Sequence, residues 1–460
     1  MSLRCAVDEV ATALAGGSRT RISGAFTSIP LPSDFDPRSL LSLGAPVVAS
    51  YERPDHGFAL VGIGEAARID LAVGEAPTAA RSGVRELLGD VATLDHPELR
   101  PRLMGGFRFA PDDPAEAPWT RFSSGSLVLP RFLFVLDGER VGVVVEPNTD
   151  PLDAQSLIEE GLERGLTDDL GTELGLGLRE VHSVDETAWR DSVRTIAAEI
   201  RDGAYEKAVL ATSVELEGET ELPLGTTLAQ LRADYPDCHV ASFTAGDATI
   251  VCASPELLIN LEGGRARTLA LAASQRRGHN PAEDCALGSE LLADAKSRVE
   301  HEVVVREIVE GLEGAIDALE VDSKPSVRRF RNIQHLATEV AGSARDGVDV
   351  LELVERLHPT PAVCGRPRDI ARRVIGEHEP FDRGWYSGPI GWLDAQGEGE
   401  FAVALRTALI SDRRAWLFAG NGIMGDSDPQ VELAEVRLKL RPLAEALGGR
   451  VETEASAIHV

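Results

Sequence analysis

One stretch near the end of the chain, residues 420–442, restricts most strongly what the chain can fold into: it reads GNGIMGDSDPQVELAEVRLKLRP. It predicts a glycine-rich turn that leads directly into a helix. Asp428 can cap the first helical turn, and Pro429 suits the first helical position because no amide hydrogen is needed there. The turn contains three glycines, which allow closely spaced backbone amides that can cradle an anion (Gly420, Gly422 and Gly425).

The expected helix carries charged side chains on the side where apolar ones also gather. At 100° per residue, Glu432, Glu435 and Lys439 fall within about 60° of one another, with apolar neighbours on both flanks. The opposite face carries polar residues (Gln430, Arg437 and Arg441). A solvated Glu435–Lys439 pair is the ordinary outcome of such spacing. Carboxylates that point inward need a cation or a metal, so the pattern favours a divalent ion that binds an acidic substrate.

The charge of the chain narrows the choice of partners. Its 460 residues could form one large domain or two or three smaller ones, with a sizeable core in either case. There are 75 acidic and 46 basic residues, for a formal net charge of −29, and the acidic residues are spread throughout. This balance argues against nucleic acid and against an anionic membrane as partners.

Lysine is rare, because only four of the 46 basic residues are lysines (Lys207, Lys296, Lys324 and Lys439). A dispersed acidic surface with so few lysines indicates a halophilic protein, soluble in concentrated salt, where screening shortens charge repulsion to about 3 Å. Drift in a GC-rich genome is the alternative. Each of the four remaining lysines is therefore a candidate for a specific role that kept it in the sequence.

The cysteines and the hydropathy pattern indicate a cytoplasmic protein. The five cysteines are odd in number and show no metal-ligand spacing, which is typical of reduced thiols (Cys5, Cys238, Cys252, Cys285 and Cys364). No apolar run approaches the roughly 18 residues of a membrane span, and the N-terminus lacks the apolar core of a signal peptide. We expect a monomer by default.

Residues 1–180 alternate short apolar stretches with turns rich in glycine, proline and aspartate, which predicts a strand-rich half. That this half belongs to the same compact unit as the rest of the chain is an expectation by analogy. Its clearest element is a hairpin that turns at Asp137 and Gly138. No catalytic motif is evident in this half. Residues 150–185 predict a helix and a connection to the second part, residues 185–450, where the motifs lie.

Two residues of the second part stand where a strand begins or breaks. Lys207 lies near the start of an expected strand, after a helix over residues 187–202; an exposed lysine at a strand end is the alternative to a functional role. Glu256 belongs to Ser254-Pro255-Glu256, which interrupts a strand. A simple capping turn is the alternative interpretation of that tripeptide.

Residues 288–319 predict a long helix that repeats the inward pattern of charge. Lys296, Glu300 and Glu307 share a stripe with two valines, whereas other charges lie opposite (Arg298, Glu302 and Arg306). Two separate helices thus each offer an inward carboxylate, as required for a divalent ion held by few protein ligands with its remaining positions open.

Two further residues and one loop are candidates for the same site. On sequence grounds His335 is more simply a satisfied core histidine than a ligand-binding one. Arg406 lies among alanines on one face of an expected strand over residues 401–410, with room for a carboxylate ligand or, alternatively, a salt bridge to a buried acid. Three prolines and a glycine predict a fixed irregular loop around Ala362, in HPTPAVCGRP (358–367).

Taken together, these segments resemble the chorismate-utilising enzymes, and among them the isochorismate synthase branch. The matching segments follow one another in unbroken order: EKAVLA (206–211), ASPELL (253–258), LALAAS (269–274), AKSRVEHE (295–302), HLAT (335–338), LHPTPAVCGRP (357–367), EPFDRGWYSGPIGW (379–392), LRTA (405–408), AGNGI (419–423) and SDPQVELAEVRLKL (427–440). Chance agreement over so many ordered segments is not a realistic explanation.

The resemblance implies an α+β fold, a large mixed α/β sandwich in which an extensive antiparallel sheet is surrounded by helices. It implies that Lys207 is the general base and Glu256 the general acid. It also implies that Glu300 and Glu435 bind Mg²⁺, with support from Glu432 through water. The residues implied to bind the substrate chorismate are His335, Ala362, Tyr386, Arg406, Gly422 and Lys439.

The implied reaction moves a hydroxyl group around a ring. Water activated by Lys207 attacks carbon 2, while Glu256 protonates the hydroxyl group that leaves carbon 4. Lys207 must then be neutral and Glu256 protonated, and Mg²⁺ acts as a template and electrostatic clamp for the ring carboxylate.

The chain departs from the family pattern in two places, and a further position bears on the branch within the family. Ala272-Ala273-Ser274 replaces the usual Ala-Gly-Thr, and Asn421 stands in the middle of the usual Gly-Ala-Gly, although neither change removes a chemical group. Relatives that make anthranilate, aminodeoxychorismate or salicylate tend to carry threonine where this chain has Ala362, which favours isochorismate synthase.

Several alternatives remain at this point. A salicylate synthase, or component I of an anthranilate or aminodeoxychorismate synthase, would use the same residues. An acidic metal-binding scaffold protein is the alternative outside the enzymes. Menaquinone biosynthesis is the expected use of the product, while catechol siderophores and salicylate stay open.

Overall fold

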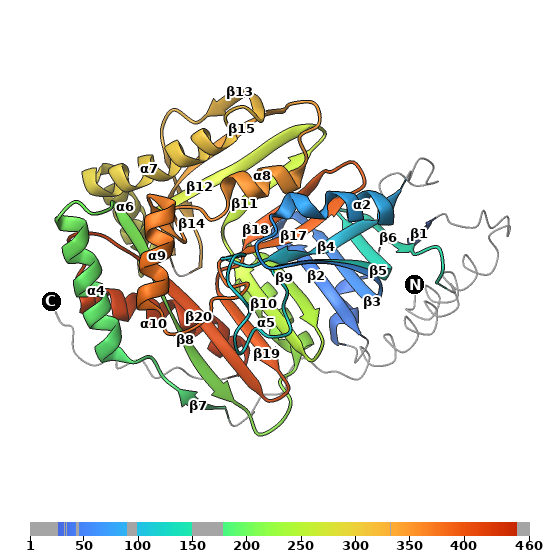
Figure 1. The fold of residues 1–460 in the computed structure, drawn as a ribbon, viewed down its shortest axis with the longest axis horizontal. Coiled ribbons are helices and arrows are strands. Elements are labelled where there is room, and N and C mark those ends of the chain that lie inside the picture. Colours follow the sequence, from blue (N-terminus) through green and yellow to red (C-terminus); the bar gives the residue numbers. More distant parts are fainter. Residues whose placement is uncertain are drawn as a thin grey trace.

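A computed structural model of the chain describes residues 26–31, 33, 35–42, 46–89, 99–149, 178–331 and 333–448. The helices shown in Figure 1 are α2 (Arg81–Leu88), α4 (Glu186–Arg201), α5 (Leu224–Asp234), α6 (Pro281–Ala293), α7 (Ala295–Leu312), α8 (Val350–Leu357), α9 (Arg368–His378) and α10 (Pro429–Ala446). Three short 3₁₀ helices are η1 (Pro37–Ser42), η2 (Pro54–His56) and η3 (Pro77–Ala80). None of the helices in these ranges has the length and apolarity needed to span a membrane.

The strands in the described part of the chain join one network of antiparallel pairs. They are β1 (Thr27–Leu31), β2 (Val47–Arg53), β3 (Phe58–Leu71), β4 (Arg102–Phe107), β5 (Gly125–Asp137), β6 (Arg140–Val145), β7 (Arg179–His182), β8 (Lys207–Glu217), β9 (His239–Ala245), β10 (Ala248–Ser254), β11 (Leu257–Glu262), β12 (Arg265–Arg276), β13 (Ile316–Val321), β14 (Ser326–Arg329), β15 (Ile333–Ala344), β16 (Gly365–Arg366), β17 (Pro389–Asp394), β18 (Gly399–Val403), β19 (Thr407–Ser411) and β20 (Arg414–Ile423).

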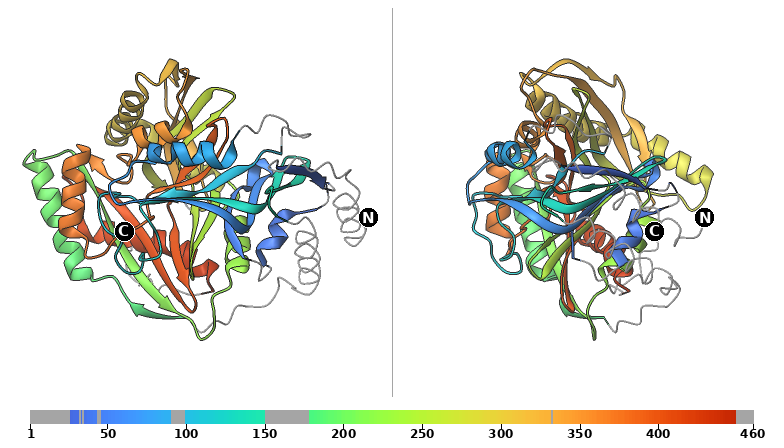
Figure 2. Two further views of the ribbon diagram at one scale, coloured as in Figure 1. Left: turned by 45° about the vertical axis from the view of Figure 1, so that its right-hand side comes forward. Right: turned by 90° about the vertical axis from the view of Figure 1, so that its right-hand side faces the viewer.

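Helices cover this sheet from outside, and the α+β class expected from the sequence is confirmed. In Figures 1 and 2, α4, α9 and α10 lie beside the long strands β8 and β20, whereas α6 and α7 lie beside β12 and β15. The two groups of helices therefore border the region between them from opposite sides. The strands β8, β10, β18 and β20 each have one end in this region.

Helix α10 begins as predicted, because the Asp428 side chain accepts hydrogen bonds from the amides of Gln430 and Val431. One flank of its charged stripe is core, since three apolar side chains pack against β20 (Leu433, Val436 and Leu440). The other flank is not, because Val431 and Leu438 are 60% and 44% exposed. The charged stripe therefore lies at the edge of the core, whereas the sequence pattern placed it fully inside.

Three element predictions require correction. The helix expected over residues 288–319 is the end of α6 followed by α7, because Asp294 has an extended backbone and caps α7 through the amide of Ser297; α7 ends at Leu312, and the last expected residues belong to β13. The strand expected over residues 401–410 is two strands with different partners: β18 pairs with β17 and β11, and β19 pairs with β10 and β20. The turn expected from residue 420 begins only after Ile423, where β20 ends.

The hairpin of the N-terminal half is confirmed. Strands β5 and β6 pair in register from Asp137 opposite Arg140, and Gly138 between them has a φ of 61°, in the left-handed region that favours glycine. Of the helix and connection expected over residues 150–185, residues 150–177 lie outside the described residues, and residues 179–182 form strand β7. Cys5 also lies outside them, while the other four cysteines are free thiols (Cys238, Cys252, Cys285 and Cys364).

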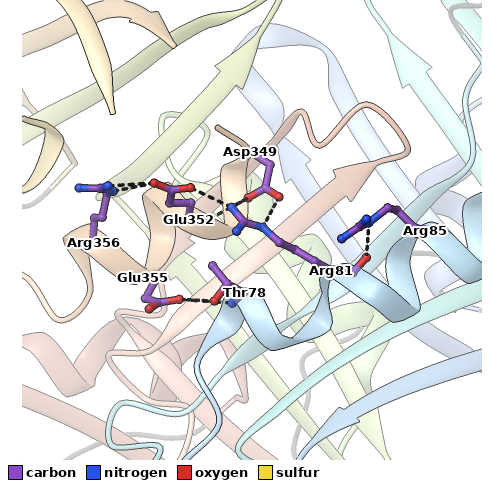
Figure 3. A network of polar contacts seen from close by, with 7 residues as sticks. All are labelled: Thr78, Arg81, Arg85, Asp349, Glu352, Glu355 and Arg356. Atoms are coloured by element: carbon purple, nitrogen blue, oxygen red, sulfur yellow. Dashed lines mark hydrogen bonds and ion pairs between the residues drawn. The ribbon is translucent and has the colours of Figure 1, made fainter. Parts of the chain in front are cut away.

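Strands from residues 26–149 pair directly with strands from residues 178–448, since β2 pairs with β9 and β4 pairs with β17. Figure 3 shows a polar network that adds a side-chain link between the two parts. Arg81 at the start of α2 donates to Asp349 at 2.6 and 2.9 Å and to Glu352 at 2.9 Å, and Thr78 donates to Glu355 at 2.7 Å. Such partly exposed pairs contribute only about 0.2–1 kcal/mol each, so the network chiefly aligns α2 with α8.

Candidate active site

A cavity of about 330 Å³ lies between α7 and α10, at the ends of the central strands. Every site residue expected from the sequence lines it: Lys207, Glu256, Glu300, His335, Ala362, Tyr386, Arg406, Gly422, Glu432, Glu435 and Lys439. These residues come from both helices, from the three strands β8, β15 and β20, from two breaks between strands, from the loop after α8 and from the segment between α9 and β17. The tertiary fold thus brings together groups that are up to 232 positions apart, from Lys207 to Lys439.

Lys207 is the first residue of β8 and is only 6% exposed, so the exposed strand-end alternative is wrong. Its Nζ atom lies 3.2 Å from Oε1 of Glu300. Gly422 on the paired strand β20 explains how the lysine fits, because a Cβ atom at that position would stand 2.6 Å from Cε of Lys207. A side chain at position 422 would therefore displace the end of Lys207 from its present place.

Glu256 occupies the break between β10 and β11 and is 7% exposed. Its backbone amide donates to Oγ of Ser254 at 3.1 Å, and its carboxylate accepts a hydrogen bond from Oγ1 of Thr360 at 3.1 Å. Burial raises the pKa of Glu256 to about 7, although Thr360 and the charge of Lys207 act in the opposite direction. Near neutral pH the Glu256 carboxyl group is therefore protonated in a large fraction of the molecules, as a general acid must be.

Two carboxylates on different helices face the cavity, each paired with a lysine. Glu300 on α7 contacts Lys207, and Glu435 on α10 lies 2.9 Å from Nζ of Lys439. Burial raises the pKa of Glu432, and the neighbouring charge of Glu435 raises it further. A further positive charge at this place would relieve that repulsion.

These residues fit a hard divalent cation. All three carboxylates offer oxygen donors, which Mg²⁺ prefers, and such an ion commonly takes one or two carboxylates with water and substrate oxygens in its other positions. Within the described ranges, no group of three acidic, histidine or cysteine side chains is close enough to form a complete metal site. A metal here would therefore be bound by Glu300 and Glu435 together with non-protein ligands.

The ammonium group of Lys439 has three acceptors. Besides Glu435, it donates to the carbonyl oxygen of Gly420 at 3.1 Å and to Oδ1 of Asn421. Lys296, by contrast, pairs at 2.5 Å with Asp426, and both side chains are more than half exposed. The inward position predicted for Lys296 is wrong, although it lies at the rim of the cavity.

His335 lines the cavity from β15, so its interpretation as a core histidine is corrected. Its Nδ1 atom lies 3.0 Å from Oγ of Ser274. Burial lowers the pKa of His335 to about 3, and the charges of Lys439 and Arg406 lower it as well. The imidazole is therefore neutral at physiological pH and offers hydrogen bonding without charge.

Arg406 lies in the break between β18 and β19 with a φ of 47°, in the left-handed region, instead of within a strand face. Its guanidinium carbon is 4.9 Å from the centre of the Tyr235 ring, and Nη1 is 3.3 Å from Sγ of Cys238. Among the residues that the structure describes, Arg406 forms no ion pair within 4.0 Å, so the alternative of a salt bridge to a buried acid is wrong. This guanidinium is available to an anionic ligand.

The remaining wall is held by residues that the sequence alone did not single out. Arg383 donates to the carbonyl oxygens of Val363 at 2.8 Å and Val209 at 2.7 Å, and it pairs with Glu379. These bonds tie the loop that carries Ala362 to the strand that carries Lys207. Glu379 and Arg383 stand four residues apart, which was the available signal, but such spacing usually indicates a surface pair.

Tyr386 lies three residues after Arg383 and stacks on Phe418, with ring centres 5.5 Å apart. Burial raises the pKa of Tyr386 to about 12, so its hydroxyl group stays neutral. A Cβ atom at Gly420 would stand 3.1 Å from that hydroxyl oxygen. The glycines at 420 and 422 thus make room for Tyr386 and Lys207, whereas the sequence pattern had suggested a free loop that cradles an anion.

Comparison with known proteins adds independent information. Residues 28–448 match the family described as chorismate binding enzyme. The chain is 35% identical to isochorismate synthase MenF of Bacillus subtilis, over 77% of this chain and 76% of that protein. It is 37% identical to the salicylate biosynthesis isochorismate synthase of Pseudomonas aeruginosa, over 79% of this chain and 77% of that protein.

Among solved structures, the fold is similar to that of MenF, the menaquinone-specific isochorismate synthase from Escherichia coli. The TM-score is 0.79 at 28% sequence identity, and the match covers 97% of this chain and all of that chain, 100%. The N-terminal half, which carries no motif, is therefore included in the structural match.

Proposed function

The chain belongs to the chorismate-binding enzyme family, and from that premise we propose that it converts chorismate to isochorismate with Mg²⁺ as cofactor. The observation that carries this proposal is the pair formed by Lys207 and Glu256. Both are buried, both line one cavity, and the pKa of Glu256 is raised to about 7. A base and a protonated acid within one cavity suit the exchange of one ring hydroxyl group for another.

The proposed steps assign one proton transfer to each residue. Lys207, as the base, removes a proton from water, which attacks carbon 2 of the ring. The protonated carboxyl group of Glu256 gives its proton to the hydroxyl group that leaves carbon 4, so a second water is released and the ring double bonds shift. Thr360, which contacts Glu256 at 3.1 Å, orients the carboxyl group for that transfer.

The other cavity residues bind the substrate in this proposal. Arg406 has no ion pair of its own in the described part of the chain and suits a carboxylate with its planar fork. The Tyr386 hydroxyl group and Lys439 bind carboxylate oxygens, and the neutral ring of His335 lies beside the substrate ring. Gly422 leaves the space in which the substrate approaches Lys207.

Glu300 and Glu435 would hold Mg²⁺, and Glu432 would support it through water. When bound, the ion supplies positive charge that neutralises the ring carboxylate of the substrate and fixes its orientation. The donor set supports this assignment because all the candidate ligands are carboxylates on the cavity wall.

The first test concerns the product. We expect chorismate with Mg²⁺ to give a reversible mixture of chorismate and isochorismate, without pyruvate and without effect of ammonium. The reason is Ala362 on the cavity wall, whose methyl group offers no hydroxyl group to orient the enolpyruvyl side chain for elimination. Chromatography of the products, with lactate dehydrogenase to detect pyruvate, is the measurement.

Two other outcomes would each move the protein to another branch of the family. Salicylate with an equal amount of pyruvate would indicate a salicylate synthase. An aminated product in the presence of ammonium would indicate component I of an anthranilate or aminodeoxychorismate synthase. Binding of metal without any consumption of chorismate would favour the scaffold alternative.

We further propose menaquinone biosynthesis as the use of the product. Its support is the similarity to the menaquinone-specific enzyme over 97% of this chain. The 37% identity to a salicylate-pathway relative is the competing observation. Loss of menaquinone from cells that lack this gene is the expected result, and loss of salicylate alone would contradict it.

A second prediction concerns salt. The formal net charge of −29 and the presence of only four lysines support a protein adapted to concentrated salt. We expect activity and native circular dichroism to require molar salt, because dilution restores repulsion among the acidic side chains. Activity and ellipticity measured against KCl concentration test this expectation. Light scattering of the same samples tests whether the protein is the expected monomer. At about 50 mM salt, charge repulsion extends over more than 10 Å. Full activity there would favour genome composition as the cause of the acidic, lysine-poor sequence.

A further inference from the structure

Asn421 is a polar residue on the apolar face of strand β20. Alternate residues of this strand, namely Ala415, Leu417, Ala419 and Ile423, belong to the core that packs against α10. Asn421 has the same parity and is 2% exposed. An amide buried at such a position is unfavourable unless its hydrogen bonds are satisfied, so its partners indicate what it does.

The Asn421 side chain is fully engaged by two site residues on α10. Its Nδ2 group donates to Oε2 of Glu432 at 3.0 Å and to the carbonyl oxygen of Glu432 at 3.1 Å. Its Oδ1 atom accepts from Nζ of Lys439. One amide thus connects a carboxylate and an ammonium group that lie two helical turns apart on the charged stripe.

The contact with Lys439 has a consequence for Glu435. Lys439 donates to two neutral acceptors, Asn421 and the carbonyl oxygen of Gly420, and to one charged acceptor, Glu435. The neutral acceptors hold the ammonium group against β20 even if Glu435 turns to another cation. Without Asn421, Lys439 would depend more on Glu435 and would compete with a metal for that carboxylate.

We propose that Asn421 is a positioning residue, which orients Glu432 and Lys439 so that the carboxylates of α10 are available to a divalent cation and Lys439 to the substrate. This proposal deepens the function proposed above and rests on it for the identity of the substrate. Asn421 touches neither reacting atoms nor substrate in this scheme. It acts through the two residues that it bonds.

The test uses Asn421→Leu and Asn421→Ala. Leucine is larger than asparagine but branches at the same carbon and suits the apolar face of β20, whereas alanine is smaller and adds no bulk, so at least one variant should fold, and the melting temperature of each verifies this. Both variants should raise the Kd of Mg²⁺ about tenfold to a hundredfold in calorimetry without substrate, as is typical for the loss of a group that supports metal ligands. The KM for chorismate should rise by a similar factor, while kcat at saturating metal and substrate should stay within about threefold.

Ile423→Val is the matched control, because it removes one methyl group from the same face of the same strand. It should lower the melting temperature and leave the Kd and the KM unchanged. The proposal is overturned if both Asn421 variants keep a wild-type Kd and KM, whatever their melting temperatures, or if kcat falls while the Kd and KM stay constant. If the Asn421 variants change the Mg²⁺ affinity as expected but the wild type does not isomerise chorismate, the proposed function is refuted. The role of Asn421 towards the metal then remains.

Discussion

Lys207→Ala and Glu256→Ala should each lower kcat with chorismate by about 10²- to 10⁴-fold, the usual contribution of a positioned base or acid. Each variant loses the group that transfers one of the two protons, and within the described residues neither Lys207 nor Glu256 directly contacts a second group of its kind that could replace it. Lys207 contacts Glu300, and Glu256 contacts Thr360. Steady-state kinetics with product chromatography measures the loss, and circular dichroism verifies the fold.

Two matched controls separate catalysis from a general loss of charge. Lys324→Ala removes an exposed lysine, and Glu262→Gln alters an exposed glutamate at the end of β11. Both should keep wild-type kcat. Near-normal turnover in Lys207→Ala or in Glu256→Ala would show that the residue has a different role from the one proposed.

The pH profile provides a second readout for Glu256. Because the acid must be protonated and its pKa is about 7, activity controlled by this group should be present below pH 7 and be lost as the pH rises above it. Thr360 lowers that pKa through its hydrogen bond, so Thr360→Val should move the alkaline limb to higher pH. An alkaline limb that stays in place in Thr360→Val would indicate that another group controls it.

Glu435→Gln should weaken Mg²⁺ binding by more than about a hundredfold, since removal of a direct ligand should exceed the effect of losing a group behind it. Activity should fall with the metal, and in the wild type EDTA should abolish activity and added Mg²⁺ restore it. The substitution keeps the size of the side chain but removes the charge that now pairs with Lys439 at 2.9 Å. We therefore expect substrate binding to weaken together with metal binding.

Calorimetry of Mg²⁺ binding without substrate, followed by KM for chorismate, measures both effects. Glu445→Gln is the matched control, because Glu445 lies on the same helix, is exposed and pairs only with Arg441 in the described part of the chain. It should behave as the wild type. Full activity and unchanged Mg²⁺ affinity in Glu435→Gln would remove the metal assignment.

Residue type and local spacing were enough to find the charged members of the site. Glu300 and Glu435 stood out because carboxylates on the inner side of a helix need a cation, and Lys207 and Lys439 because the chain has so few lysines. The same pattern placed Lys296 inward, where the structure shows it exposed. A helical wheel gives the direction of a side chain but not the depth at which the helix lies, and α7 begins at the rim of the cavity.

Local signals also determined elements with short-range causes. The cap at Asp428, the hairpin at Gly138 and the break at Glu256 depend on residues a few positions apart, so they could be predicted without the fold. The division of residues 401–410 into two strands could not. It arises because β18 and β19 pair with different strands, which is a long-range choice.

The sequence by itself therefore determined which chemical groups the site contains, since these follow from residue type, rarity and helical periodicity. Only the tertiary structure decided how those groups act on one another. Gly422 leaves the space that the end of Lys207 occupies, burial raises the pKa of Glu256, and Asn421 bonds Glu432 and Lys439 on another element. The physical reason is that excluded volume, desolvation and hydrogen-bond geometry depend on atoms brought together from distant parts of the chain, which local sequence patterns do not specify.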